Sequence, residues 1–557
     1  MSLADRWSLR RAIDGDRLLL AAIGGGATLL LVVFVILPLW GILSYSLITP
    51  EGIGFGNYVR YFSDPRFVSI IGNTFEVSVS VTVATILLAY GFAYALERTR
   101  VPFKPLLRIA ALLPIFSPSL VQALGLQFLL GRNGLINRTF GTELDIYGFW
   151  GIFFADLLYA FPHAFLILST ALAVGDQRLY ESAQVLGASA WRTFRTVTLP
   201  ATRYGLASAV FVVFTIVITD FGNPVVIGGN YSVLAVEIYN QVSGQANFSM
   251  GAVIGVLLLF PAALAVGAER WVSRHQHASI GAQSVPLTPR VNRRRDALWL
   301  AYCLAMAAAL VAIVAVVVYA SFVRLWPYDM SLSLRHYAFD VQNGITPLWT
   351  SIQVAFVTAG IAVVVVTLAA YANQQLSETW KRPLYFLSIL PAAVPGMVLG
   401  LGYILAFNDP AHPVYAIYGG LAIIALCNVY HYHAQGFLLA TTNMKQISRT
   451  FEEASSTLGA SRLATLLRVI LPIIWPSVLA IGAFFFMRAM VTLSAVIFLI
   501  TPSTQLAAVS VLYLDDRGAL NQAAAFAVCI MATVVGFLLL TQAVLRLAGV
   551  RNVSLIR

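Results

Sequence analysis

The sequence predicts an all-α multi-span membrane protein with twelve transmembrane helices, arranged as two parallel-repeated halves of six helices each. Three observations support this. Of the 557 residues, 59% are hydrophobic and only 11% are charged, whereas soluble domains average roughly 25% charged residues. Apolar runs of about 20 residues or more recur along the chain. One polar segment between such runs occurs twice. The short alternating segments of about ten residues that a closed β-barrel needs are not seen.

The apolar runs divide equally between the halves. In the first half they lie near 18–46, 68–95, 106–131, 147–174, 201–228 and 248–271. In the second they lie near 297–323, 346–375, 384–407, 415–440, 474–501 and 521–547. The expected organisation is an N-terminal segment (1–17), a first half (18–271), a linker (272–296), a second half (297–547) and a C-terminal tail (548–557). The first run resembles a signal peptide at its start but continues without a small-residue cleavage site, so it is interpreted as the first span.

Lysine and arginine counts predict the orientation. If the N-terminus is cytoplasmic, 27 of the 35 basic residues fall on cytoplasmic segments, 7 fall on outer loops, and Arg488 lies inside a span. Cytoplasmic loops of membrane proteins carry such an excess. The net charge of +11 is therefore read as an orientation signal, and no nucleic-acid partner is expected. Cys303, Cys427 and Cys529 lie inside apolar runs without metal-binding or disulfide spacing, so no metal site is expected.

The repeated segment reads ESAQVLGASAWRTFRTVTLP at 181–200 and EASSTLGASRLATLLRVILP at 453–472, an offset of 272 residues. In each copy we expect a short helix to end at a glycine (Gly187, Gly459), because glycine tolerates the left-handed conformation of a helix C-terminus. The serine that follows is a good N-cap for a second short helix. A proline (Pro200, Pro472) is expected to close that helix. Each copy is thus a predicted helix–turn–helix in the cytoplasm.

This pattern of Glu-x-Ala, glycine, a basic amphipathic stretch and Leu-Pro resembles the "EAA loop" of bacterial ABC importer permeases, in the group that transports ferric iron, polyamines and aminoethylphosphonate. The resemblance implies a type I, MetI-like fold in the bacterial inner membrane, with both termini cytoplasmic. It also implies that each loop docks into a cytoplasmic ATPase. The residues implied in coupling are Glu181, Ala183, Gly187, Pro200, Glu453, Ala454, Gly459 and Pro472.

The implied partners are two copies of the ATPase, an external (periplasmic) solute-binding protein and the lipid bilayer. No phosphate-binding G-x-x-x-x-G-K-[ST] motif occurs. We therefore expect a transport subunit, not an enzyme, with no cofactor of its own and with ATP and Mg²⁺ on the partner. The alternative of another class is a secondary transporter that needs no ATP. It fits the parallel duplication but gives no role to the repeated loops. An amphipathic helix that lies on the membrane surface is the alternative for each loop, but a duplication with a fixed glycine and proline is more than membrane adhesion requires.

Charged residues inside spans mark candidate substrate contacts. The segment Thr219–Pro224 contains glycine and proline that would interrupt the fifth span. By the offset of 272 it corresponds to a segment of the eleventh span that lacks these residues. The expected substrate-pathway residues are Asp220, Asn223, Arg488, Thr492 and Ser494. An ion pair between Asp220 and Arg488 with a structural role is an equal alternative.

The solute is indicated only by resemblance. Residues 218–252 look most like permeases assigned to 2-aminoethylphosphonate, and ferric iron is the alternative because that group also fuses two halves. A phosphonate zwitterion would suit Arg488 together with Asp220. A naked ferric cation would favour carboxylates alone.

Overall fold

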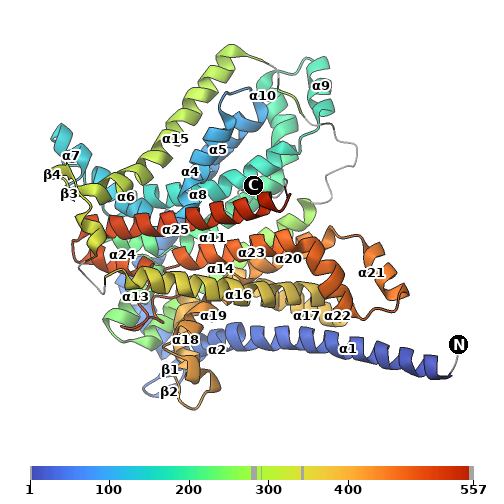
Figure 1. The fold of residues 1–557 in the computed structure, drawn as a ribbon. Coiled ribbons are helices and arrows are strands. Elements are labelled where there is room, and N and C mark those ends of the chain that lie inside the picture. The colour runs from blue at the N-terminus through green and yellow to red at the C-terminus, as the bar shows by residue number, and fades with distance from the viewer. Residues whose placement is uncertain (1–2, 277–284, 286, 290, 340–343, 551–557) are drawn as a thin grey trace. The chain divides into compact units, whose positions relative to one another are not determined.

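The computed structural model describes residues 3–276, 285, 287–289, 291–339 and 344–550 (Figure 1). Parts of the predicted N-terminal segment (1–2), linker (277–284, 286, 290) and C-terminal tail (551–557) lie outside the described residues. The regular secondary structure of the described residues is helical except for two small antiparallel hairpins. One pairs β1 (Ile48–Thr49) with β2 (Gly52–Ile53), and the other pairs β3 (Val323–Leu325) with β4 (Asp329–Leu332).

Within the described residues, nine helices are long and apolar enough to cross a membrane. They are Leu18–Leu47, Pro65–Arg98, Phe149–Ala173, Ala190–Ile218, Phe248–Arg274, Arg293–Phe322, Thr346–Gln375, Arg462–Val491 and Leu520–Leu547. Two bent helix pairs raise the number to eleven if each pair is one span. The all-helical, multi-span class is therefore confirmed. The remaining predicted span, 415–440, is instead two helices, α19 (Leu421–His431) and α20 (His433–Lys445), which meet at Tyr432.

The chain forms two compact units that do not follow the order of the sequence. Unit 1 comprises Met1–Ser44, Thr346–Leu506 and Ala532–Arg557, and unit 2 comprises Tyr45–Ile345 and Ala507–Met531. The first helix of each predicted half therefore packs with helices of the other half. In unit 1, α1 (Leu3–Leu31) packs on α16 (Thr346–Gln375), and in unit 2, α15 (Arg293–Phe322) packs on α6 (Leu120–Leu130). Figure 1 shows both pairs. The predicted boundaries of the sequence repeat stay a prediction.

Unit 2 is built around the packing of α4 on α8. The elements are α3 (Gly56–Ser63), α4 (Pro65–Arg98), α5 (Lys104–Leu112), η2 (Leu113–Phe116), α7 (Leu135–Phe140), α8 (Phe149–Ala173), α9 (Gln177–Val185), α10 (Ala190–Thr193), η3 (Phe194–Thr198), α11 (Leu199–Ile218), α12 (Gly222–Ile227), α13 (Leu234–Tyr239), η4 (Asn240–Gly244), α14 (Phe248–Gln276), η6 (Arg335–Ala338) and α24 (Ala507–Asp516). Phe92 of α4 lies edge-on to Phe161 and Phe165 of α8, at ring-centroid distances of 5.5 and 5.3 Å. Edge-to-face contacts of this kind add to the stability that apolar burial gives.

Unit 1 is built around α16 and α23. Its other elements are η1 (Val32–Ile36), α2 (Leu37–Leu47, which runs past the end of the unit's first segment), α17 (Glu378–Ile389), η7 (Leu390–Ala393), α18 (Gly396–Phe407), η8 (Pro413–Ile417), α21 (Arg449–Thr457), α22 (Arg462–Thr465), η9 (Leu466–Ile470) and α23 (Leu471–Val491). The last helix, α25 (Leu520–Leu547), begins in unit 2 and ends in unit 1. Phe34 of η1 stacks on Tyr430 of α19, with ring centroids 5.1 Å apart.

The duplication that the sequence predicts recurs in the backbone. Both halves contain a Leu-Pro at the start of a 3₁₀ turn, Leu113–Phe116 in η2 and Leu390–Ala393 in η7. The helices on either side of these turns are bent by 105° and 110°. Proline removes a backbone donor and clashes with the preceding turn, so an apolar segment that carries it bends at the same place in both copies.

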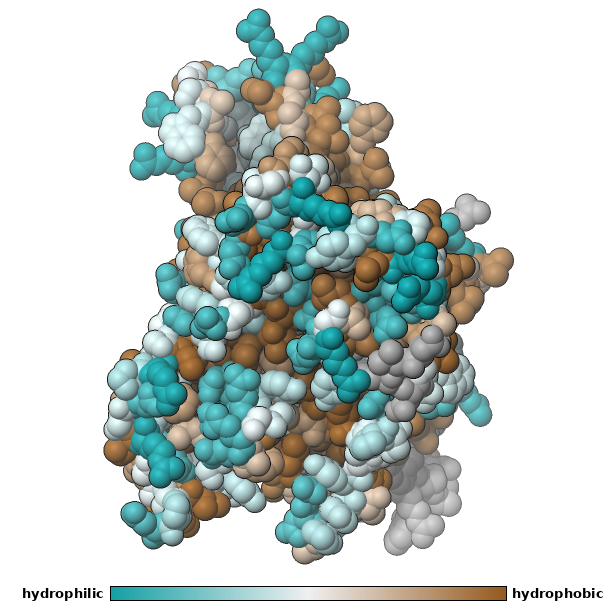
Figure 2. All heavy atoms as spheres, turned by 90° about the vertical axis from the view of Figure 1, so that its left-hand side faces the viewer, coloured by the Kyte–Doolittle hydropathy of each residue, from teal (hydrophilic) through white to brown (hydrophobic). Residues whose placement is uncertain are grey.

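In unit 2, α7, β3 and β4 lie in loops at the opposite end of the spans from α9 and α10 (Figure 1). This side is turned toward the viewer in Figure 2, where hydrophilic and hydrophobic side chains are interspersed. A mixed surface of this kind is typical of a face that contacts water rather than hydrocarbon, because unpaired polar groups are costly in lipid.

The packing of α15 on α6 gives a stability prediction. A Cβ atom on Gly125 of α6 would lie 2.6 Å from Ile313 Cγ2 and 2.7 Å from the Ile313 carbonyl oxygen. Because a carbonyl in a helix cannot move aside cheaply, we expect Gly125→Ala to lower the free energy of unfolding by about 1–3 kcal/mol. Thermal unfolding in detergent measures this. The control is Gly267→Ala in α14 of the same unit, where a Cβ atom meets nothing within 4 Å. An equal melting temperature for the two variants would contradict the close packing.

Candidate functional site

The first repeated segment forms what we call repeated loop 1 (177–200). Its helix α9 begins after Asp176, whose carboxylate accepts a hydrogen bond from Arg178 N at 3.1 Å. Gly187 follows the helix with a φ of +71°. Ser189 then caps α10 by accepting a hydrogen bond from Arg192 N at 3.3 Å. The helix end, the glycine conformation and the serine cap are all as predicted.

Repeated loop 2 (449–472) has the same geometry. Its helix α21 is followed by Gly459 with a φ of +74°, and Ser461 accepts a hydrogen bond from Ala464 N at 3.3 Å at the start of α22. A Cβ atom on Gly187 or on Gly459 would meet nothing within 4 Å. Glycine is therefore needed at both positions for its backbone conformation and not for space.

The prediction that the proline closes the second helix is wrong. In repeated loop 1 the helix continues through Pro200 as one segment, Ala190–Ile218, and in repeated loop 2 it continues through Pro472 as Arg462–Val491. Each proline follows a π-helical turn, η3 or η9, and lies at the second residue of the next α-helix. The wider π-helical turn changes the hydrogen-bond register just before the proline, so its missing N–H does not end the helix.

The coupling residues differ in exposure. Glu181 and Glu453 are exposed, whereas Ala183 is buried at 8% exposure. In loop 2, Ala454 is exposed, and Ser455 takes the buried position, where its hydroxyl lies 2.7 Å from the hydroxyl of Thr465. The structural counterpart of Ala183 is thus Ser455, as the offset of 272 requires. Both loops also expose large apolar side chains: Val185, Leu186, Trp191, Leu458 and Leu463.

Segments distant in the sequence hold the start of repeated loop 1. Gln177 N donates to the carbonyl of Val285 at 3.0 Å, and Gln177 Oε1 accepts from both N and Oγ1 of Thr288 at 2.9 Å. Gln177 Nε2 also donates to Glu181 Oε1 at 2.7 Å. The described residues of the linker are therefore connected, through one glutamine, to the glutamate of the motif.

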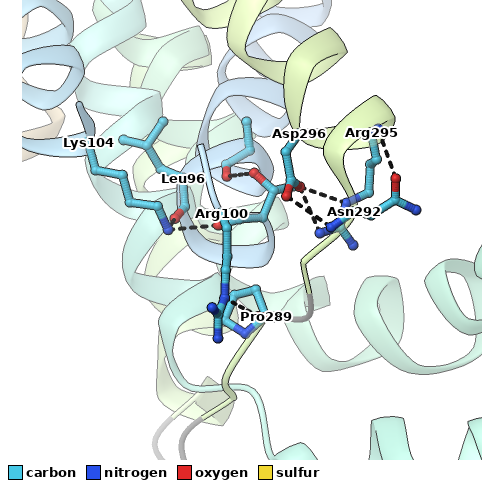
Figure 3. A network of polar contacts seen from close by, with 9 residues as sticks. Leu96, Arg100, Lys104, Pro289, Asn292, Arg295 and Asp296 are labelled. Carbon is cyan, nitrogen blue, oxygen red and sulfur yellow. Dashed lines mark hydrogen bonds and ion pairs between the residues drawn. The ribbon is translucent and has the colours of Figure 1, made fainter. Parts of the chain in front are cut away.

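The described residues of the linker also form a hydrogen bond with the turn that follows α4. Figure 3 shows Arg100 Nε donating to the carbonyl of Pro289, at 2.8 Å. The turn itself is closed by Lys104, whose ammonium group donates to the carbonyls of Leu96 and, at 2.8 Å, Thr99. The helix α15 then begins at Arg293, and the side chain of Asn292 just before it accepts a hydrogen bond from Arg295 N at 3.1 Å. The linker thus bridges two polar turns of unit 2.

Repeated loop 2 is held by a different element, the N-terminal helix. Asp16 Oδ1 of α1 accepts a hydrogen bond from Arg462 N at 3.0 Å. Tyr371 of α16 donates to the Arg462 carbonyl at 3.3 Å. A hollow of about 450 Å³ lies beside these contacts, and Asp16, Gln375, Glu453 and Arg462 are among its lining residues. Sequence analysis missed Asp16, because no local pattern links it to a residue 446 positions away.

The predicted interruption of the fifth span is confirmed. The helix α11 ends at Ile218, and α12 begins at Gly222. Asp220 Oδ2 accepts from Asn223 N at 2.9 Å, and Asn223 Nδ2 donates to Asp156 Oδ1 of α8 at 2.8 Å. Asn223 Oδ1 accepts from Ala123 N of α6 at 3.2 Å. Asp156 and Asn223 are buried, at 1% and 0% exposure. Asp156 was not among the predicted pathway residues.

The other three predicted pathway residues lie in unit 1, at the end of α23. The Arg488 guanidinium lies over the ring of Tyr432, 5.5 Å from its centroid. The Tyr432 hydroxyl is 2.8 Å from the Thr492 hydroxyl, which also donates to the Arg488 carbonyl at 2.6 Å. Ser494 packs against Gly396, where a Cβ atom would lie 2.3 Å from the serine hydroxyl. A substrate role for these residues stays a prediction.

The outer loops of unit 2 enclose a hollow of about 540 Å³. Arg132, Asp145, Tyr147 and Tyr231 are among its lining residues, and Arg132 and Asp145 form an ion pair at 3.5 Å. Burial raises the pKa of Tyr147, so this phenol stays neutral at physiological pH. From the sequence, the four longer outer loops (48–67, 132–146, 229–247 and 324–345) are the expected docking surface for the binding protein, and no particular residue in them stands out.

The contact between Asp16 and Arg462 gives the second prediction. Loss of one hydrogen bond at a helix start costs about 1 kcal/mol. We therefore expect Asp16→Ala to raise the amide exchange rate of Arg462 several-fold, whereas Asp16→Asn keeps an acceptor oxygen and most of the protection. Hydrogen exchange read by mass spectrometry measures both variants. Asp409→Ala, a loop carboxylate elsewhere in unit 1, is the control. Unchanged exchange in Asp16→Ala would show that the contact does not hold the loop.

Comparison with known proteins identifies the family. The model described as "Binding-protein-dependent transport system inner membrane component" matches residues 82–276 and 365–548, which is more than half of the chain. The chain is 28% identical to the ferric transport system permease protein FbpB of Actinobacillus pleuropneumoniae, over 95% of this chain and 78% of that protein. It is 29% identical to the putative ferric transport system permease protein FbpB 1 of Haemophilus influenzae, over 89% of this chain and 80% of that protein. The spermidine/putrescine permease protein PotB of Haemophilus influenzae is 28% identical over 33% of this chain and 68% of that protein.

The two matched ranges contain the two repeated loops, one in each range. The chain therefore belongs to the family of binding-protein-dependent transport system inner membrane components, as an ABC transporter permease that carries the family's domain twice and leaves ATP hydrolysis to a partner.

Proposed function

We propose that this chain is the permease of an ATP-driven importer for ferric iron. Two copies of a cytoplasmic ATPase act on the two repeated loops, and an external binding protein delivers the solute. The observation that carries the coupling role is the matched geometry of the loops. Both have a left-handed glycine, a serine cap and a continuous helix that runs into a membrane span. A rigid helix that joins an exposed loop to a span can transmit displacement of the loop into the membrane.

The exposed apolar side chains of the loops support a protein partner. Leu186 and Leu458 occupy corresponding positions outside the membrane spans, and they are 82% and 87% exposed. Apolar groups gathered next to a polar, hydrogen-bonded loop are typical of surfaces that a partner covers. Exposed Glu181 and Glu453 would then pair with basic groups of the ATPase.

The proposed topology has twelve spans with both termini in the cytoplasm. The nine long helices and the two bent pairs supply eleven spans, and α19 with α20 supplies the twelfth. The basic residues then lie mainly on the cytoplasmic side, as the positive-inside rule requires.

Ferric iron is preferred over 2-aminoethylphosphonate for two reasons. Two relatives that align over most of the chain are named as ferric transport permeases. In addition, Asp220 interacts with a second carboxylate and an amide of its own unit. A hard cation favours oxygen ligands of this kind. The predicted zwitterion site would instead need Asp220 to act together with Arg488.

The test is ATP-driven uptake in proteoliposomes that contain the permease, its ATPase and its binding protein. In the double variant Gly187→Asp/Gly459→Asp, both substituted residues must adopt a φ above +70°, which costs a non-glycine residue about 1–2 kcal/mol at each site. We expect uptake to fall at least tenfold, because the loops lose their geometry. Ferric iron and 2-aminoethylphosphonate are offered separately as solutes.

Gly549→Asp is the matched control. Its φ of +81° imposes the same strain outside the loops, and a Cβ atom there also meets nothing within 4 Å. Uptake that runs on an ion gradient without ATP and ignores the loop glycines would establish a secondary transporter instead. Uptake of aminoethylphosphonate but not of iron would keep the importer and replace the solute.

A further inference from the structure

A short helix of unit 2 exposes an apolar face beside the start of a membrane span. The helix α3 follows Phe55, its N-cap residue, and carries Val59 and Phe62. These three residues are spaced by four and then three positions, so their side chains lie on one face of the helix. Their exposed fractions are 71%, 64% and 53%. Large apolar side chains gathered on one face in this way mark a surface that something other than water covers.

The other two sides of α3 differ from this apolar face. Asn57 and Tyr61 are buried against the protein. The Asn57 amide donates to a carbonyl of β1 at 2.7 Å, and the Tyr61 hydroxyl donates to a carbonyl in the first turn of α4 at 3.1 Å. Arg60 and Ser63 form a third side, which is polar and exposed. A helix that lies in the surface of a membrane has this division into a polar and an apolar face.

The neighbouring span shows where the hydrocarbon core begins. The candidate span α4 exposes a row of large apolar side chains: Val68, Phe75, Val79, Val83 and Leu87. The row covers about 20 residues of helix, or about 30 Å, and the hydrocarbon core of a bilayer is about as thick. Glu76 lies beside the row and accepts a hydrogen bond from the Tyr231 hydroxyl at 2.9 Å, so its carboxylate has a polar partner at that depth. Val68 therefore marks the level at which the core begins.

The corner between the two helices holds α3 at this level. The helix α3 ends at Ser63 and α4 begins at Pro65, so Asp64 alone joins them. Asp64 accepts a hydrogen bond from Arg66 N at 2.9 Å, and its carboxylate forms an ion pair with the Arg66 guanidinium at 2.7 Å. The Arg66 side chain is 86% exposed, as a charged group at the edge of the hydrocarbon must be. The apolar face of α3 thus lies within a few residues of Val68.

We propose that α3 is an interfacial helix that lies on the lipid bilayer. Phe55, Val59 and Phe62 enter the boundary between headgroups and acyl chains of the leaflet at which α4 begins, and Arg60 faces the headgroups. Lipid is the partner because the apolar face lies at the edge of the lipid-facing row of α4, with one residue of chain between the helices. The contact fixes the depth of the start of α4 in the membrane. It needs only that α4 spans the bilayer and is independent of the solute and of ATP.

The experiment compares two sides of α3 at neighbouring positions. Val59→Cys and Arg60→Cys are each labelled with a nitroxide in the full-length permease, which is then placed in nanodiscs of phosphatidylethanolamine and phosphatidylglycerol. Electron paramagnetic resonance measures the collisions of each label with oxygen, which concentrates in lipid, and with a water-soluble nickel chelate. The ratio of oxygen to nickel collisions is expected to be several-fold higher at position 59 than at position 60. Equal ratios, or a lower ratio at position 59, would overturn the proposal.

The two variants are matched to each other. Val59 and Arg60 are adjacent and both exposed, so the labels do not displace packed side chains of the protein. The permease without an added cysteine gives the background from its native thiols. Cys303 and Cys427 are buried and Cys529 is half-buried, so this background is expected to be small, and it is subtracted.

The same label at position 59 distinguishes lipid from a protein partner. A second copy of the chain on this face would broaden the spectrum through coupling between two labels, and dilution with unlabelled permease would remove the broadening. The external binding protein, if it covered the face, would lower both collision rates when it is added. Either result would overturn the proposal in favour of a protein partner. With lipid on the face, dilution and the binding protein are both expected to leave the spectrum and the collision ratio unchanged.

Discussion

The absence of water in the hydrocarbon core governs this molecule. Every backbone N–H and C=O within the membrane must find a partner in the protein, which leaves helices as the only economical structure for an unbroken apolar run. Where the chain departs from a helix, side chains or neighbouring helices replace the lost partners. Asp220 and Asn223 do so at the break after α11. The chain also departs from a straight helix at the two Leu-Pro turns, where the bends have nearly equal angles. The interruptions are therefore the informative parts of an otherwise repetitive fold.

The two halves share a backbone plan but not a distribution of charge. The repeated loops agree in their glycine and serine geometry, whereas the elements that hold them differ: the linker contacts loop 1, and the N-terminal helix contacts loop 2. The same holds at the polar break, where the offset of 272 places Asn428 and Thr492 of unit 1 at the positions of Asp156 and Asp220 of unit 2. A fused chain permits this divergence, because each copy can mutate alone. In a symmetric dimer of one half, every substitution would appear twice.

Local sequence patterns predicted what local physics determines. The apolar runs gave the spans, and the glycine and the serine of each loop gave its turn and its cap, since these depend on neighbouring residues only. Pro200 and Pro472 were misjudged because a π-helical turn, which depends on packing, precedes each of them. The contacts of Asp16 and Gln177, and the contact of Asp156 with Asn223, were not predicted because the partners are distant in the sequence. Periodicity and motif spacing carry no signal for such contacts.

The exchange of first helices between the halves bears on how the chain is made. When α1 leaves the ribosome, its packing partner α16, which begins at Thr346, has not been synthesised. At ordinary translation rates of about 5–20 residues per second, α1 waits on the order of tens of seconds in the bilayer. An apolar helix can wait there at little cost, since lipid satisfies its surface as well as protein does. The same interval would expose a soluble helix to aggregation. Insertion into the membrane thus allows α1 to be made long before the helices that pack on it. Unit 1 is complete only after α25 has been synthesised, because the end of that helix belongs to it.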